Sequence, residues 1–441
     1  MMIQFGYVLT KFKTVFNFVS LNLVILHQTK NIMPETKDEI ILITINGDDK
    51  PGITSALTEI LAKFNAIILD IGQAGIHQSL SMGIMFKMPE NAPPGAVLKE
   101  LLFRAYELKV SINFTPISIE NYNAWVSRQG KGRHIITVLG RKITAEQISQ
   151  ITQEIASQGL NIDSIKRLTG RMSLNTEDTE DSRACIELSV RGTLKNRDEM
   201  HANFMMLSAS LGVDISFQKD NMYRRNRRLI CFDMDSTLIK TEVIDELADR
   251  AGVGEQVRAI TESAMRGEID FTESFLQRVA LLKGLDVSAM EEIAQQLPIM
   301  EGADRLMSIL KKCGFKIAIL SGGFSYFGNY LKRRFGIDYV YANELEIEDG
   351  KLTGRHLGDI VDGKRKAELL KLIAQVENIE LEQVIAIGDG ANDLPMLNLA
   401  GLGIAFHAKP KVKESARQSI STIGLDGVLY FLGFRDVHID E

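Results

Sequence analysis

The chain has 441 residues, of which 45% are hydrophobic and 24% are charged, and its formal net charge is −6. This length predicts roughly two to four domains, and the composition is that of a soluble globular protein with ample apolar residues for its cores. The net negative charge argues against a nucleic-acid-binding protein. Three widely spaced cysteines in apolar segments, Cys185, Cys231 and Cys313, indicate reduced thiols in a cytoplasmic protein.

Residues 1–32 differ in composition from the rest, because they contain lysines, no acidic residue and an apolar run from Val15 to Leu26. The run is too short to span a bilayer, which needs about 20 apolar residues, and no small-residue cleavage site follows it. We therefore expect residues 1–37 to be a disordered extension and the protein not to associate with a membrane. Two alternatives are translation that starts at Met33 and an amphipathic membrane anchor.

Two stretches of the chain predict the same order of elements, strand–helix–strand–strand–helix–strand. The first covers residues 38–118 and the second covers residues 134–218. Their sequences also align, since TINGDDKPGITSALTEI at 44–60 matches TVLGRKITAEQISQITQEI at 137–155. An internal repeat of this kind predicts two α+β domains with ferredoxin-like topology.

The turn that follows the first predicted strand, Asp48-Asp49-Lys50-Pro51-Gly52, resembles that of ACT domains. Such domains commonly bind small amino acids and pair through their sheets. The resemblance implies an amino-acid effector, with serine the simplest, at Asp49 and Gly52, and a homo-oligomer such as a dimer. The second stretch has Thr144 and Ala145 near this position, which removes the basis for the close backbone approach that Gly52 allows. The alternative is that both ACT-like domains are dimerisation modules without a ligand.

Two charged segments are interpreted as solvated. The segment Gly170–Ser182 carries several acidic residues and is expected to be a hairpin loop. The segment Lys219–Arg228 carries Arg224, Arg225, Arg227 and Arg228. Such a run can bind nucleic acid, but because this one joins two predicted domains we interpret it as a solvated linker.

The apolar run Leu229–Phe232 predicts a buried strand that ends in Asp233. Asp235 lies two residues further on and points to the same side of an extended chain. The two carboxylates are therefore expected at the carboxyl end of a buried strand, where open α/β sheets bind ligands. Their mutual repulsion would raise one pKa unless a cation lies between them. Oxygen ligands without a His or Cys cluster favour Mg²⁺ over Zn²⁺.

Residues 228–434 predict a third domain, which is an α/β domain with a doubly wound parallel sheet. Helical patterns follow one another between about residues 245 and 298, and we interpret this block as a helical cap inserted after the first strand. Beyond the cap, apolar strands alternate with helices, and this alternation indicates a parallel sheet. The further strands are expected at 316–320, 339–342, 384–387 and 403–405.

The sequence Asp-Met-Asp-Ser-Thr at 233–237 resembles the first motif of the haloacid dehalogenase-like phosphatases, and the other motifs of that family follow in order. They are Ser321-Gly322-Gly323 after the second strand, Lys366 before an Ala-Glu-Leu helix, and Gly-Asp-Gly-Ala-Asn-Asp at 388–393. The resemblance implies that Asp233 attacks phosphorus and that Asp235 is the acid and base. It also implies that Asp389 completes a Mg²⁺ site with Asp233 and the backbone carbonyl of Asp235.

The same motifs imply a site for the phosphate group. A hydroxyl and free backbone N–H groups at a helix start, as in Ser321–Gly323, form an anion site. Lys366 is expected to offset the charge of the phosphate and the nucleophile. By resemblance, Asn392 hydrogen-bonds the phosphate, and Asp393 holds Lys366 or a metal-bound water.

The motifs at 233–237, 321–323 and 388–397, together with Glu242 and Arg278, resemble those of the phosphoserine phosphatases. With the ACT-like repeat in front, this resemblance covers about residues 38–434. Phosphoserine carries an ammonium and a carboxylate besides its phosphate, so its site needs one further anion and one further cation. Glu242 lies a few residues past the nucleophile and can supply the anion. The alternative for Glu242 is an exposed first-turn residue favoured by the helix dipole.

Arg278 is the predicted cation. It shares a helix face with Phe271, Phe275 and Leu282, and a charge on an apolar stripe needs a partner. A substrate carboxylate suits the planar guanidinium. The alternative is a structural acid in the cap. By resemblance, Met265 and Phe271 form apolar walls of the substrate pocket.

Together with these residues, the resemblance implies an Mg²⁺-dependent phosphomonoester hydrolase that converts O-phospho-L-serine to L-serine and phosphate through an aspartyl-phosphate, the last step of serine biosynthesis. One alternative is a phosphatase for another small phosphomonoester, such as a sugar phosphate, which would not need Arg278. Another is an amino-acid sensor with a vestigial phosphatase domain. The intact set of motif residues argues against the sensor. Related ion pumps have a non-acidic residue where Asp235 stands, so Asp235 favours a hydrolase.

Overall fold

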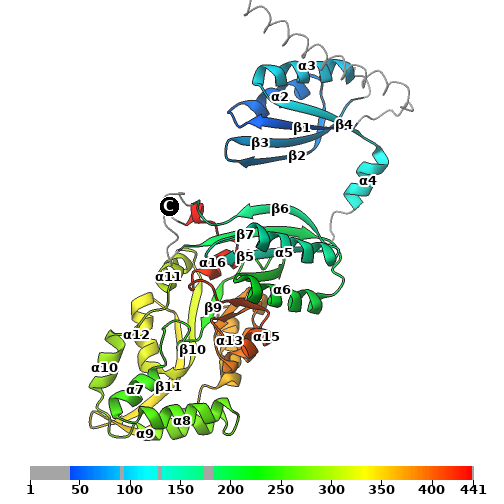
Figure 1. Ribbon diagram of the computed structural model, residues 1–441. Coiled ribbons are helices and arrows are strands. Elements are labelled where there is room, and N and C mark those ends of the chain that lie inside the picture. Colours follow the sequence, from blue (N-terminus) through cyan, green and yellow to red (C-terminus); the bar gives the residue numbers. More distant parts are fainter. Residues whose placement is uncertain (1–39, 90–93, 128–131, 172–181, 440–441) are drawn as a thin grey trace, which may run out of the picture. The chain divides into compact units, whose positions relative to one another are not determined.

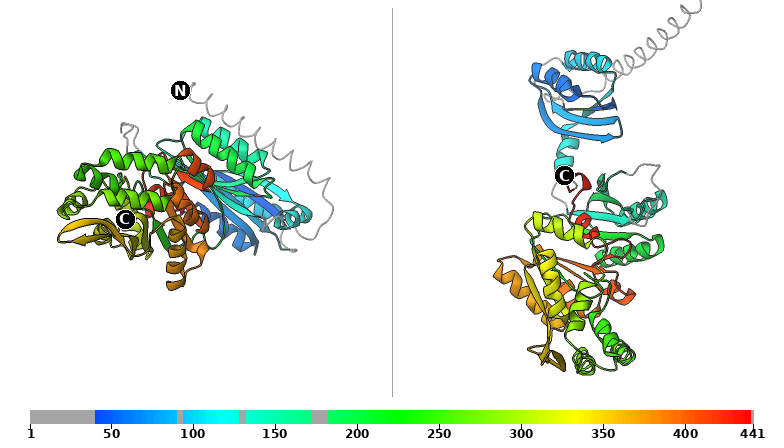
Figure 2. Two further views of the ribbon diagram at one scale, coloured as in Figure 1. Left: turned by 90° about the horizontal axis from the view of Figure 1, so that it is seen from below. Right: turned by 90° about the vertical axis from the view of Figure 1, so that its left-hand side faces the viewer.

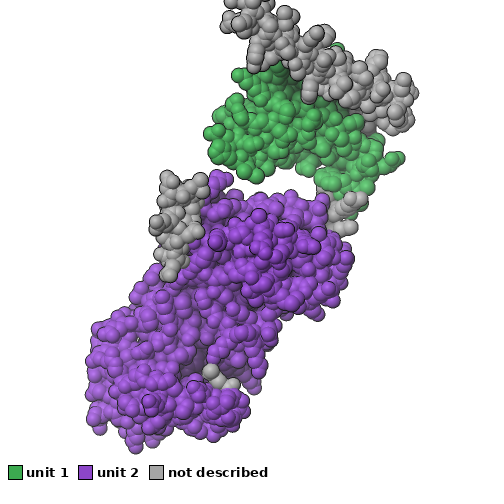
Figure 3. Space-filling view, in the orientation of Figure 1, with its two compact units in different colours: residues 1–130 green, residues 131–441 purple. Residues whose placement is uncertain are grey.

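The computed structural model describes residues 40–89, 94–127, 132–171 and 182–439 (Figure 1). The predicted extension 1–37 and residues 172–181 of the acidic segment lie outside the described part. The chain divides into two compact units, residues 1–130 (unit 1) and residues 131–441 (unit 2) (Figure 3). In the described part, no helix is long and apolar enough to cross a membrane.

Unit 1 contains the first repeat, and its elements follow the predicted order. They are β1 (Ile40–Asp48), α2 (Ile53–Lys63), β2 (Ile67–Ile76), β3 (Ser79–Lys87), α3 (Pro94–Leu108) and β4 (Ser111–Ile117). The strands form an antiparallel sheet in the order β2-β3-β1-β4. Alternate residues of β1, such as Ile43 and Ile45, are fully buried against Leu57 of α2 and Leu101 of α3. A helix that the sequence analysis did not predict, α4 (Ile119–Ser127), follows β4 and buries none of its residues.

Unit 2 begins with the second repeat, which has the same topology. Its elements are β5 (Arg133–Gly140), α5 (Ala145–Ser157), β6 (Asn161–Arg167), β7 (Ala184–Arg191), α6 (Arg197–Leu211) and β8 (Asp214–Lys219). The sheet order is β6-β7-β5-β8. Helix α5 begins with a capping box, in which the Thr144 hydroxyl accepts from the Gln147 N–H at 3.3 Å and the Thr144 N–H donates to Gln147 Oε1 at 2.7 Å. The Thr-x-x-Gln pattern therefore starts this helix without the Pro-Gly turn of the first repeat.

The rest of unit 2 is an α/β domain around a seven-stranded sheet in the order β12-β11-β10-β9-β13-β14-β15. Its strands are β9 (Leu229–Phe232), β10 (Lys316–Phe324), β11 (Tyr339–Glu348), β12 (Lys351–Leu357), β13 (Val384–Gly388), β14 (Leu402–Phe406) and β15 (Gln418–Ile420). All neighbours pair in parallel except β12, which pairs antiparallel with β11. The predicted doubly wound parallel sheet is confirmed.

Both faces of this sheet are covered, which explains why its strands are continuous apolar runs. Along β9, Ile230 and Phe232 pack into one core cluster, whereas Leu229 and Cys231 pack into another on the opposite face. The helices that cover the two faces are α11 (Ala303–Lys312) and α12 (Ser325–Phe335) on the first, and α13 (Gly363–Val376) and α14 (Leu394–Leu399) on the second (Figures 1 and 2). Two short helices, α15 (Pro410–Ser415) and α16 (Gly427–Phe431), complete the domain.

A helical cap follows β9, as the sequence predicts. It consists of α7 (Val243–Ala251), α8 (Gly254–Met265), α9 (Phe271–Leu281) and α10 (Ser288–Gln295). The hairpin of β11 and β12 reaches this cap, since the Gly284 N–H donates to the Leu352 carbonyl at 2.8 Å. The sequence analysis missed β12, although Asp349-Gly350 is a typical hairpin turn and both residues have positive φ, 48° and 73°.

Candidate active site

Three carboxylates meet at the carboxyl ends of neighbouring strands. Asp233 follows β9, and Asp389 follows β13, which pairs in parallel with β9. Asp393 lies one turn beyond Asp389. Oxygen atoms of the three side chains lie within 4.8 Å of one another. Because β9 has β10 on its other side, the cluster lies at the crevice where connections leave the sheet in opposite directions, and such crevices bind ligands.

The buried ammonium of Lys366 joins two of these carboxylates. Its Nζ lies 2.9 Å from Asp233 Oδ1 and 2.7 Å from Asp393 Oδ1. Burial alone would lower the pKa of Lys366, but the two carboxylates outweigh burial and raise it, so this side chain remains charged. The Gly390 N–H donates to the other oxygen of Asp393 at 2.9 Å. Asp393 is thus fully occupied in holding Lys366 and the loop after β13.

Asp389 provides the test of whether a cation fits here. Burial, followed by repulsion from Asp233 and Asp393, raises the pKa of Asp389 to about 8. The Thr237 hydroxyl, which donates to Asp389 Oδ1 at 3.2 Å, lowers it less than these effects raise it. A divalent cation would remove this repulsion and allow all the carboxylates to ionise. The donors are oxygen atoms alone, which suits Mg²⁺.

Asp235 lies in a different environment from Asp233. Its side chain is buried and accepts the N–H of Val243 at 3.2 Å. Burial, Glu242 and Asp233 together raise the pKa of Asp235 well above its ordinary range. The raised pKa favours the protonated carboxyl, which can act as a general acid.

The Ser-Gly-Gly segment packs directly against Asp235. A Cβ atom at Gly323 would lie 2.3 Å from Asp235 Oδ2, so only glycine leaves room for the carboxyl there. The Ser321 hydroxyl is buried and accepts the Gly323 N–H at 2.9 Å. The sequence analysis placed this segment at a helix start, but it belongs to β10, and α12 begins only at Ser325. The strand continues because the pairing of β10 with β11 shifts register between Leu320 and Phe324.

Asn343, which the sequence analysis missed, fixes this segment from β11. Its Nδ2 donates to the Gly322 carbonyl and its Oδ1 accepts the Val361 N–H, both at 2.8 Å. The side chain is buried and both of its ends are engaged. Asn343 follows the predicted strand 339–342 in sequence, and a polar residue directly after a predicted strand was the available signal.

Asn392 lies at the base of the helix that carries Lys366. A Cβ atom at Gly363, the first residue of α13, would lie 2.5 Å from the Asn392 carbonyl oxygen, so the two backbones are in close contact. The side-chain oxygen of Asn392 lies beside Gly390. The loop after β13 and the start of α13 are thereby held together.

The two residues predicted to recognise the amino-acid part of a substrate belong to the cap. Glu242 precedes α7 and accepts the Ser236 hydroxyl at 2.8 Å, and burial raises its pKa. Ser236 has φ 56°, an uncommon conformation that is typical of functional segments. Arg278 is half-buried in α9, and its Nε donates to the Ser274 carbonyl at 3.3 Å. Among the residues that the structure describes, no carboxylate lies within 4.0 Å of its guanidinium.

The predicted apolar walls have different outcomes. The Phe271 ring lies on the Ser-Gly-Gly segment, since a Cβ atom at Gly322 would be 3.0 Å from its edge. The side chain of Met265 lies outside the described part.

Asp245 is a further acid near Arg278 that the sequence analysis did not consider. The charge on Arg278 lowers the pKa of Asp245, but burial raises it more, and its Oδ1 has no hydrogen-bond partner in the described part.

The predicted effector residues lie in unit 1, in the turn between β1 and α2. Gly52 has φ 94°, so it needs the freedom of glycine, and it precedes α2 without any side-chain cap. A Cβ atom at Gly52 would meet no atom within 4 Å. The Asp49 N–H donates to the Gln78 carbonyl at 2.7 Å, which ties the turn to the β2–β3 hairpin.

Family models match nearly the whole described chain. A model described as haloacid dehalogenase-like hydrolase matches residues 227–401, and two models described as ACT domain match residues 39–115 and 132–218. The chain is 39% identical to a phosphoserine phosphatase of Mycobacterium tuberculosis over 393 residues, which is 89% of this chain and 93% of the relative. It is 40% identical to the phosphoserine phosphatase of Saccharomyces cerevisiae over 314 residues, 70% of this chain and 98% of the relative.

Solved structures show the same likeness. A crystal structure of a haloacid dehalogenase family hydrolase from Salmonella enterica serovar Typhi is 32% identical, with a TM-score of 0.58, over 68% of this chain and 98% of that one. A probable phosphoserine phosphatase from Vibrio cholerae is 34% identical, with a TM-score of 0.54, over 68% of this chain and 86% of that one.

Proposed function

The chain belongs to the phosphoserine phosphatase family of haloacid dehalogenase-like hydrolases, and we propose that it converts O-phospho-L-serine to L-serine and phosphate as the last step of serine biosynthesis. The observation that carries the proposal is the pair of neighbouring aspartates with opposite environments. Asp233 is held by the buried ammonium of Lys366, whereas Asp235 is buried beside other acids. In the first environment the ammonium offsets the charge of a nucleophilic carboxylate, and in the second the raised pKa favours the protonated form of an acid.

In the first half of the reaction, the Asp233 carboxylate attacks phosphorus and an aspartyl-phosphate forms as the bond to the serine oxygen breaks. Asp235 donates its proton to the departing oxygen, so serine leaves as a neutral alcohol. In the second half, Asp235 accepts a proton from water as that water attacks the aspartyl-phosphate. Phosphate then leaves and Asp233 is regenerated.

Three side chains are proposed to contact the phosphate: Lys366, the Ser321 hydroxyl and the Asn392 amide. The Ser321 hydroxyl and the Gly323 N–H bond each other at 2.9 Å, and an incoming phosphate oxygen can replace this bond. Mg²⁺, held by Asp233, Asp389 and the backbone carbonyl of Asp235, would supply further positive charge at the phosphate. Asp393 acts by positioning Lys366.

Specificity is proposed to come from the cap. Glu242 would pair with the substrate ammonium and Arg278 with its carboxylate, while Phe271 and Met265 would cover the apolar part. Arg278 supports this assignment because its charge is half-buried and no carboxylate of the described residues lies within 4.0 Å of it. A planar carboxylate is the natural partner for such a guanidinium.

The experiment that tests the function measures phosphate release from O-phospho-L-serine, a sugar phosphate and an aryl phosphate, with and without Mg²⁺. In the Arg278→Ala variant, we expect kcat/KM for phosphoserine to fall about 30-fold or more, which is roughly 2 kcal/mol for a lost buried charge contact. Activity on the aryl phosphate, which has no carboxylate, should change little. The control is Arg258→Ala, because Arg258 is an exposed arginine of the cap that pairs with Asp249. Equal losses on both substrates would show that Arg278 is structural.

We also propose regulation and assembly through the ACT-like domains at 38–118 and 134–218, which precede a catalytic domain at 228–434. A small amino acid such as serine would bind at Asp49 and Gly52, and the open space at Gly52 supports this. A dimer would form through the sheets, and the exposed isoleucines of the edge strand β2 support it: Ile67, Ile68, Ile71 and Ile76. The free cysteines support a cytoplasmic location.

A further inference from the structure

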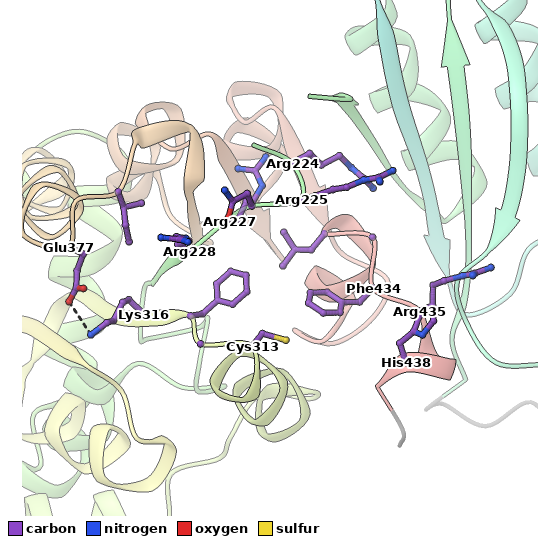
Figure 4. Close-up of a pocket in the computed structure, with 16 residues that line it drawn as sticks. Arg224, Arg225, Arg227, Arg228, Cys313, Lys316, Glu377, Phe434, Arg435 and His438 are labelled. Atoms are coloured by element: carbon purple, nitrogen blue, oxygen red, sulfur yellow. Dashed lines mark ion pairs between the residues drawn. The ribbon is translucent and has the colours of Figure 1, made fainter. Parts of the chain in front are cut away.

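A basic cavity lies at the end of the catalytic sheet opposite to the carboxylate cluster (Figure 4). The cavity has a volume of about 620 Å³ and is formed entirely by residues of unit 2. Arg228, which directly precedes β9, and Lys316, which begins β10, both line it. Asp233 and Ser321 belong to the other ends of these two strands. The cavity is therefore separate from the proposed active site.

Part of the wall is the arginine segment that the sequence analysis interpreted as a solvated linker, and that interpretation is wrong for two of its members. Arg224 is buried, with 3% of its side chain exposed, and it pairs with Glu187 of β7. Arg227 donates to the carbonyl groups of Glu382, Val384 and Gly401. These acceptors lie at or just before the starts of β13 and β14 and compensate for the partial burial of Arg227, as Glu187 does for Arg224. The Nε atoms of both arginines remain without a partner in the described part.

Positive charge in the cavity greatly exceeds negative charge. The cations are Arg224, Arg225, Arg227, Arg228, Lys316 and Arg435, and the carboxylate is Glu377. Glu377 already pairs with Lys316 at 3.2 Å (dashed in Figure 4). Within the described residues, Arg225, Arg228 and Arg435 have no carboxylate within 4.0 Å. Burial, and after it the neighbouring charge of Arg224, lowers the pKa of Arg227 to about 10.

The same cavity has an apolar side. It is lined by Phe315, Ile379, Leu432 and Phe434, and Figure 4 shows Phe434 between the arginines and the C-terminal segment that carries Arg435 and His438. Arginine forks match phosphate oxygens, and aromatic rings stack on nucleobases. The volume lies within the range of small-ligand sites. We propose that this cavity binds a nucleoside phosphate, with its phosphates on the arginines and its base against Phe315 and Phe434.

The test is calorimetric titration of the full-length protein with ATP, with tripolyphosphate in parallel. We expect ATP to bind with a stoichiometry of one per chain and more tightly than tripolyphosphate. The double variant Arg225→Glu, Arg228→Glu should weaken ATP binding at least about tenfold, because two cations that face the phosphates become anions. Both side chains are exposed, so their reversal should not disturb folding. Turnover of phosphoserine by the double variant checks that the fold persists.

Two controls make the result specific. Arg333→Glu is the same charge reversal at an exposed arginine of α12 outside the cavity and should leave ATP affinity unchanged. Ser321→Ala alters the proposed active site and should also leave it unchanged. No binding of ATP, an equal loss in the Arg333 variant, or a loss in the Ser321 variant would overturn the proposal. Equal affinity for tripolyphosphate would overturn the assignment of a nucleoside.

Discussion

The two ferredoxin-like repeats share one topology but differ in what their last strands contact. In the first repeat, β4 is an edge strand with exposed and half-buried residues. In the second, the corresponding strand β8 is buried except for its last residue, because β15 of the catalytic domain lies beside it. The side-chain amide of Gln418 in β15 pairs with the backbone of Phe217 in β8. Its Oε1 accepts the Phe217 N–H at 3.0 Å and its Nε2 donates to the Phe217 carbonyl at 2.9 Å. The second repeat therefore forms one compact unit with the catalytic domain.

The repeats differ in a second way, at the turn before their first helix. Gly52 has a left-handed backbone and leaves open space, whereas Thr144 fills the equivalent position and caps α5. The repeat in unit 2 thus has a turn closed by a capping side chain, and the repeat in unit 1 has an open turn at Gly52. We therefore predict that the second repeat contributes to the stability of the catalytic domain and that a response to an amino acid depends on the first repeat.

The largest effect that sharpens this comparison should come from shortening the chain. A chain that begins at residue 132 should keep the stability and basal turnover of unit 2. A chain that begins at Asn226 should lose stability, because Leu139, Leu168 and Cys185 of the second repeat are buried in the main core of the catalytic domain. Burial of each apolar side chain contributes about 1.5–3 kcal/mol. Thermal unfolding measures the stability of each shortened chain, and phosphate release measures its turnover. Equal stability of the two shortened chains would contradict the comparison.

A smaller effect is expected from one buried acid at the junction. Asp214, at the start of β8, accepts the N–H groups of Ser421 and Thr422 and the Thr422 hydroxyl, at 2.9, 3.0 and 2.6 Å. Asp214→Ala leaves these donors unpaired and should lower the free energy of unfolding by roughly 3 kcal/mol. Chemical denaturation of the full chain measures this loss.

The matched control is Ser111→Ala. Ser111 occupies the same place at the start of β4, where it is exposed and donates only to the Asn46 carbonyl at 3.0 Å. Its replacement should change stability by less than about 0.5 kcal/mol. Similar losses from both substitutions would show that β8 is no more firmly held than β4.

These contacts mark the limit of what the sequence could predict. Asp233 and Asp389 were predictable because each follows a buried strand, and parallel strands bring their carboxyl ends to one edge. Nothing local in the sequence indicates that Asp214 meets residues about 200 positions away, or that Arg224 pairs with Glu187. Such contacts depend on how complete domains pack. The interpretation of Arg224 and Arg227 as solvated was wrong for this reason, since a run of charges between domains has the same pattern whether it is solvated or buried.

The last prediction tests the open turn of the first repeat. In Gly52→Val, a branched side chain must adopt φ 94°, which costs roughly 1–2 kcal/mol locally and fills the space that an effector would need. We expect the response of phosphate release to L-serine to be lost while basal turnover stays the same, because the strain is confined to unit 1. Initial rates at increasing serine, in the intact chain and in the variant, measure the response.

Serine is also the product, so it competes with phosphoserine at the active site in both proteins. Only the part of the inhibition that persists at saturating phosphoserine belongs to a separate site, since an effector must bind one state of the protein better than another. The matched variant is Thr144→Val, which removes the capping hydroxyl of the second repeat and should cost about 1 kcal/mol of stability without changing that part. If the inhibition at saturating phosphoserine persists unchanged in Gly52→Val, or is lost to the same extent in Thr144→Val, the open turn does not distinguish the two repeats.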